Sequence, residues 1–95
     1  MSGIKVGPFT YTVETVLDLR SPEGVGCWGY LASSKHIIQI EQEMIPERAY
    51  VALWHEVLHA VDDGYLLGLG EQGVGTLGMV IVQLLQDNPA LLPVK

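Results

Sequence analysis

Apolar and polar side chains alternate with a period of two residues through the first part of the chain. The alternation marks residues 4–6 and residues 9–16 as strands, separated by a turn at Gly7-Pro8. Because successive side chains of a strand point to opposite faces of a sheet, this period predicts half-buried strands. We expect the two segments to form an early hairpin or a single bent strand.

A second pair of strands is predicted after a loop over residues 21–26, which is rich in glycine and contains Ser-Pro. Residues 28–32 and residues 36–40 flank the short connection at residues 33–35, an arrangement typical of a hairpin. His36, at the start of the later strand, is expected to lie at the solvent edge and not to bind a metal ion. We expect this later strand to lie at the edge of the sheet, where it would align an extended peptide by backbone pairing.

The second half of the chain changes to a helical period. A first helix is predicted from Pro46, a residue well suited to a first helical turn, to about Asp63, and Gly64 is expected to end it. A loop rich in glycine and leucine over residues 65–70 then leads to a second helix at about residues 71–87. The chain therefore divides into a strand-rich first half and a helical second half.

The predicted second helix carries Gly73, Gly75 and Gly78. A glycine inside a helix costs up to about 1 kcal/mol relative to alanine, so these residues need a compensating role. Gly75 and Gly78 fall on the same side of the helix as Glu71, where they would let another helix approach closely. Because a short connection packs consecutive helices together, we expect the first helix to be that neighbour.

The first helix contains the motif His55-Glu56-Val57-Leu58-His59. Residues four apart lie one turn apart on the same side of a helix, so both imidazoles could bind one Zn²⁺ at about 2.0–2.1 Å. Glu56 projects about 100° round the helix from His55, which would let it take a proton from a zinc-bound water. Glu71 is the expected third ligand, completing a catalytic His₂Glu set with an open fourth position. The alternative for Glu71 is a charge that only complements the helix dipole.

Three further side chains are candidates for supporting roles at this site. Asp62 shares a helix face with both histidines and would orient one of them, or else cap the backbone or face solvent. Tyr65 and Tyr30 are candidates for stabilising an oxyanion, with half-buried packing as the alternative for each. Cys27, the only cysteine, cannot form an internal disulfide and is expected to have no chemical role.

Composition restricts the partners. The net charge is -6, from eleven acidic and five basic residues, which argues against nucleic acid and anionic membranes. The N-terminus lacks the basic start and apolar run of a secretory signal, and no apolar run reaches about 18 residues. We therefore expect a cytoplasmic protein.

The stretch from His55 to Asp62, with Glu71 following after a short loop, resembles the small gluzincin-type zinc metallopeptidases. These minigluzincins include ImmA/IrrE-like and phage-encoded minimal forms, and the resemblance covers most of the chain after residue 27. It implies a single α+β domain over residues 1–95, with a small twisted N-terminal sheet of three or four strands packed on two helices. It also implies that His55, His59 and Glu71 bind zinc and that Glu56 is the general base. The glycines of the second helix depart from the pattern of this family.

The expected function is that of a zinc-dependent endopeptidase acting on a peptide or protein substrate, with weak turnover or self-cleavage in so small a domain. One alternative is a catalytically weak or inactive zinc-binding or regulatory module of phage or genomic-island origin. The other is a small protein that associates through the apolar tail at residues 90–94. The expected oligomeric state is accordingly a monomer or a weak homodimer.

Overall fold

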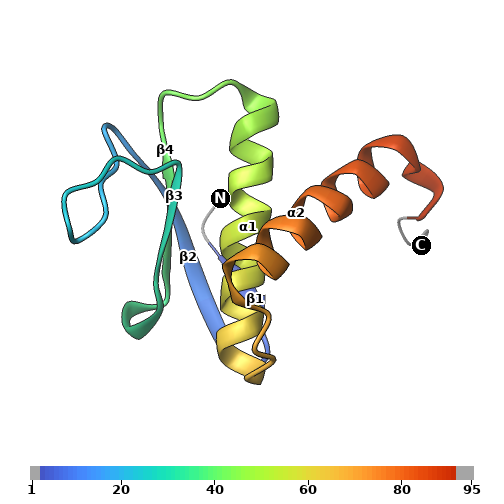
Figure 1. Ribbon diagram of the computed structural model, residues 1–95, viewed down its shortest axis with the longest axis horizontal. Helices are drawn as coiled ribbons and strands as arrows, with labels where there is room; N and C mark the ends of the chain where they lie inside the picture. The colour runs from blue at the N-terminus through green and yellow to red at the C-terminus, as the bar shows by residue number, and fades with distance from the viewer. Residues whose placement is uncertain (1–2, 92–95) are drawn as a thin grey trace.

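The computed structural model describes residues 3–91 and has an α+β fold, a four-stranded sheet followed by two helices (Figure 1). The elements are β1 (Ile4–Val6), β2 (Phe9–Val16), β3 (Gly29–Ala32), the 3-10 helix η1 (Ser33–Lys35), β4 (Ile37–Glu41), α1 (Pro46–Tyr65), α2 (Gly70–Asp87) and the 3-10 helix η2 (Pro89–Leu91). The predicted α+β class, the hairpin around residues 33–35 and both helices are confirmed, and of the two alternatives for residues 4–16 the structure shows the hairpin. The apolar tail considered above extends to residues 92–94, which lie outside the described residues.

The strands lie in the order β1-β2-β4-β3. The pairs β1 with β2 and β3 with β4 are antiparallel hairpins, whereas β2 and β4 are parallel and pair Val13 with Ile38. The expectation that residues 36–40 form an edge strand is therefore wrong, because β4 lies between β2 and β3. A hairpin pattern does not specify which of its two strands takes the next partner. The edge strand of this hairpin is β3.

Helix α1 packs on one face of the sheet. Tyr11 of β2 and Ile38 of β4 are the largest side chains of this layer and are almost completely buried. Ala52 and Ala60 of α1 belong to the same core cluster as Tyr11 and Ile38. The small side chains of the two alanines let the helix lie close to the strands. Burying a large apolar side chain contributes about 1.5–3 kcal/mol, so this layer holds α1 in a fixed position against the sheet.

His36 does not lie at the solvent edge. It follows η1 with a left-handed backbone conformation, φ 55°, and its ring packs against those of Phe9 and Tyr11 at centroid distances of 4.6 and 5.0 Å. The side chain is half-buried in this aromatic group. His36 therefore packs against the hairpin of β1 and β2, and it is not part of the histidine pair on α1.

Helix α1 ends beyond the predicted position. Gly64 lies inside the helix, and Leu66 takes the left-handed cap conformation with φ 54°. The carbonyl of Asp62 accepts the N–H groups of Leu66 and Leu67, and Gly68 and Gly70 continue the turn with φ 73°. The prediction at Gly64 was wrong because local hydrogen bonding overrides the usual preference for glycine at this cap.

Helix α2 crosses α1, and its C-terminal half extends away from the rest of the molecule (Figure 1). Its buried residues are Val74, Gly78 and Val82. Together with Leu58 of α1, which is also buried, they form the packed side of the crossing. In the described part of the chain, neither helix has the length and apolar character needed to cross a lipid bilayer.

Candidate metal centre

The side chains of His55, His59 and Glu71 meet where α2 begins beside α1. The Nε2 atoms of the two histidines are 3.1 Å apart. His55 Nε2 lies 2.6 Å from Oε1 of Glu71, and His59 Nε2 lies 2.9 Å from Oε2 of the same carboxylate. The three residues therefore offer ligand atoms close enough to bind one metal ion.

Hydrogen bonds among the three side chains do not account well for this arrangement. Each Nε2 would have to donate to the Glu71 carboxylate, and two N–H groups would then face each other at 3.1 Å. A cation between the three side chains removes this conflict, because neutral imidazoles and a carboxylate all offer lone pairs. Ligands at about 2.0–2.1 Å in tetrahedral geometry are about 3.3 Å apart, so the present separations of 2.6, 2.9 and 3.1 Å would widen slightly around such an ion. The three side chains therefore offer a donor set that could hold one metal ion.

The helix crossing explains how Glu71 reaches the histidines. A Cβ atom on Gly75 would lie 3.7 Å from Cε1 of His55, and one on Gly78 would lie 3.6 Å from both N and Cα of His55. These glycines bring the backbone of α2 into contact with α1, as the sequence predicted. The first turn of α2, which carries Glu71, consequently lies beside the histidine pair.

Asp62 contributes to the same placement. Its Oδ1 accepts the backbone N–H of Leu69 at 3.0 Å, directly before α2 begins. The side chain thus fixes the end of the loop between the helices, and of its expected roles this contact supports backbone capping. Its effect on the metal centre is indirect: the hydrogen bond fixes where α2 begins, and the first turn of α2 carries Glu71.

Glu56 is the only charged residue buried among those described, with 7% of its surface exposed. Burial raises the pKa of its carboxyl group, and the nearby charge of Glu71 raises it further, whereas His55 and His59 act to lower it. A carboxyl group with a raised pKa is a stronger base near neutral pH than an exposed one. Glu56 lies between the histidine pair and strand β3, where Gly29 is its neighbour.

A cavity of about 1160 Å³ opens above these residues, between β3, α1 and α2. His55, Glu56, His59 and Glu71 line it together with apolar side chains. The apolar part includes Trp28, Leu31, Val51 and Met79. Glu71 is the most open of the candidate ligands, with 75% of its side chain exposed, so water has direct access to the centre.

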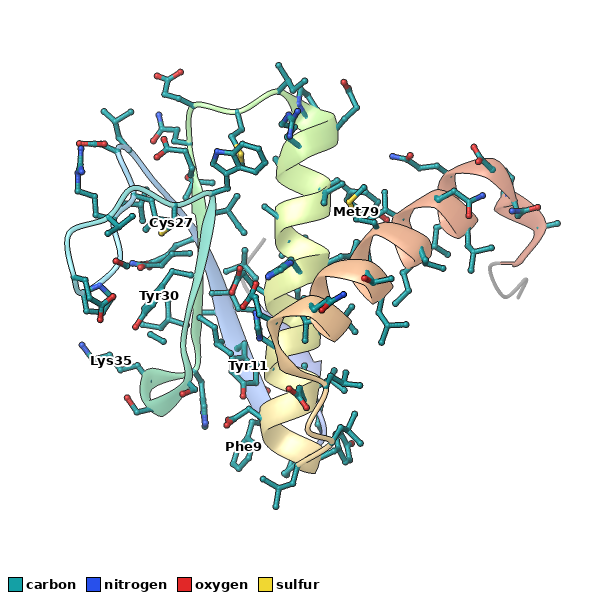
Figure 2. All side chains as sticks on the ribbon, in the orientation of Figure 1. Phe9, Tyr11, Cys27, Tyr30, Lys35 and Met79 are labelled. Atoms are coloured by element: carbon teal, nitrogen blue, oxygen red, sulfur yellow. The ribbon has the colours of Figure 1, made fainter. Side chains whose placement is uncertain are left out.

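The two tyrosines considered as oxyanion donors point elsewhere. Gly29 and Leu31 of β3 face α1, and the alternation of a strand therefore turns the Tyr30 side chain to the opposite face of the sheet (Figure 2). Tyr65 is 58% exposed at the end of α1, and its hydroxyl lies against Gly7. Neither side chain is directed at the histidine pair, so the geometry supports neither assignment.

Cys27 lies in the loop just before β3 and is half-buried. Burial raises the pKa of its thiol, and the charges of Glu56 and Glu41 raise it further. Since the thiolate is the reactive form of cysteine, these surroundings disfavour a nucleophilic role.

Sequence reasoning missed one residue of the site, Gly29. It opens strand β3 directly against the Glu56 side chain. A glycine at the start of a predicted strand is a signal for a close approach and could have pointed to it.

A search of protein-family models, curated proteins and solved structures found no match to this chain.

Proposed function

We propose that this protein is a zinc-dependent endopeptidase of the small gluzincin type. The observation that carries the proposal is the meeting of two imidazoles and one carboxylate beside the buried Glu56. Nitrogen and oxygen ligands in a set of three, with space left for water, are typical of catalytic zinc sites. Zinc bound by His55, His59 and Glu71 would polarise a peptide carbonyl and lower the pKa of water.

Glu56 is the general base of the proposed reaction. Its carboxylate is not needed as a ligand and borders the same cavity. It accepts a proton from the attacking water and then delivers this proton to the departing amine. Its raised pKa supports this exchange, because the group must both take up and release a proton near neutral pH.

Strand β3 supplies a binding edge for the substrate. The carbonyl of Trp28 accepts the N–H of Glu41, so Trp28 and Tyr30 direct their backbone groups toward β4. The backbone N–H and C=O groups of the alternate residues, Gly29 and Leu31, then point away from β4, toward the cavity side of the sheet edge. An extended peptide that pairs with this edge would pass the metal centre. Backbone pairing with the substrate, which the sequence placed at residues 36–40, is thus proposed for β3.

Cleavage by the purified protein tests the proposal. The protein is loaded with one equivalent of zinc and incubated with unfolded casein and a mixed peptide library, and the products are identified by mass spectrometry. We expect internal peptide bonds to be cleaved, with full loss of cleavage after chelation and recovery on adding zinc back.

The Glu56→Gln variant is the matched control, because it keeps the shape of the side chain and all three metal ligands. We expect it to bind zinc like the wild type and to lose cleavage by about 10²–10⁴-fold. A wild type that binds zinc stoichiometrically but cleaves neither casein, nor any library peptide, nor itself would contradict the proposal. That result would favour the zinc-binding or regulatory module.

A further inference from the structure

We propose that Gly29 is a positioning residue for Glu56: the missing side chain at this point of β3 leaves the space in which the Glu56 carboxylate lies. The catalytic meaning of this placement rests on the proposed function. The placement itself is a property of the fold and can be tested without turnover.

The contact between Gly29 and Glu56 is too close for any other residue. A Cβ atom on Gly29 would lie 2.9 Å from Cγ, 3.0 Å from Oε2 and 3.3 Å from Cδ of Glu56. Packed carbon atoms are ordinarily about 3.5–4.0 Å apart, so an alanine here would force Glu56 to move. The obstacle is a side chain and not backbone, and the strand can therefore form while the carboxylate shifts.

The backbone of Gly29 does not itself require glycine. The positive-φ glycines are Gly7, Gly24, Gly68 and Gly70, whereas Gly29 is part of a regular strand. Glycine inside a strand is destabilising by roughly 0.5–1 kcal/mol relative to alanine. The space taken by Glu56 is thus the feature that accounts for glycine at this position.

The direction of the shift matters for the reaction. Glu56 lies between β3 on one side and the histidine pair of α1 on the other, and it is almost fully buried. A side chain at position 29 would push the carboxylate away from the strand edge that we assign to the substrate. Displacement of a reacting group by about 1 Å can reduce a rate on the order of 10²-fold.

Steady-state kinetics of Gly29→Ala test the positioning role, with Gly26→Ala as the control. A Cβ on Gly26 would meet no atom within 4 Å, and this residue lies in the loop before the same strand. We expect Gly29→Ala to lower kcat on the order of 10²-fold while KM and zinc stoichiometry stay near wild-type values. Gly26→Ala should leave all three unchanged. An unchanged kcat in Gly29→Ala would overturn the proposal.

A double-mutant cycle in stability tests the same contact in the metal-free protein. Gly29→Ala should lower the urea midpoint when Glu56 is present, but leave it unchanged or raise it when Glu56→Ala has emptied the space. Equal effects in both backgrounds would overturn the proposal. Because the cycle needs no turnover, an inactive wild type would contradict the proposed function while the cycle still decides whether Gly29 places Glu56.

Discussion

Gly78 of α2 lies directly against the backbone of His55, so that a Cβ atom at this position would be 3.6 Å from both N and Cα of the histidine. The helix that supplies Glu71 thus rests on the residue that supplies the first imidazole. This contact links the helix crossing to the metal centre, because any change in the distance between the helices also moves the carboxylate relative to the histidines.

A side chain larger than a methyl group at position 78 should weaken metal binding. The 3.6 Å separation is an ordinary packing distance, so Gly78→Ala should fit and gain up to about 1 kcal/mol of helix propensity. Gly78→Val adds two methyl groups beyond the Cβ atom of the alanine variant and should push α2 outward, which lowers zinc affinity by about 10–100-fold. Competition with a chromophoric chelator measures both variants. Equal zinc affinities in the alanine and valine variants would contradict the proposed link.

Neutralising Glu71 should remove most of the metal-dependent stability. We expect zinc at about 100 times its dissociation constant to stabilise the wild type by about 2.7 kcal/mol, and Glu71→Gln to lose most of this gain. The matched control is Glu47→Gln, which removes the same charge from the exposed first turn of α1. Thermal unfolding with and without zinc gives the comparison. A full zinc response in Glu71→Gln would exclude this carboxylate as a ligand.

Removing the charge of Glu56 should stabilise the metal-free protein at neutral pH. Its pKa is raised in the folded state, chiefly by burial, so the ionised form is less favourable there than in the unfolded chain. This penalty is present at pH values above the folded pKa and fades as the pH falls below the unfolded value. Glu56→Gln should therefore unfold at a higher urea concentration than the wild type at pH 7, with a smaller difference near pH 4. A lower midpoint for the variant at pH 7 would contradict this account.

Glu41 should have the opposite pH dependence. Its carboxylate accepts the backbone N–H groups of Glu43 at 3.0 Å and Leu19 at 2.7 Å, and these bonds hold its pKa below the ordinary glutamate value. The stabilisation is present above the unfolded pKa and is lost as the pH falls through the folded pKa. Glu41→Gln should lower the urea midpoint at pH 7 and converge with the wild type in acid. Glu23→Gln, an exposed loop change, is the control and should have little effect at either pH.

Much of the local structure could be predicted because it depends on short-range periodicity. Ile38 and Ile40 are buried on one face of β4, as their alternation indicated. The start of α1 at Pro46 also follows from local chemistry, since proline suits the first helical turn. The end of α1 was predicted wrongly at Gly64, because hydrogen bonds to Asp62 carry the helix on to Tyr65.

The amino-acid sequence by itself determined the spacing of His55, Glu56 and His59, because the period of an α-helix places residues four apart on one side. Only the tertiary structure decided three other features: the edge position of β3, the burial of Glu56 against Gly29, and the distance from Glu71 to the histidines. Each depends on which surfaces of separate elements come into contact. Such contacts follow from packing and strand pairing across the whole chain, which local periodicity does not specify.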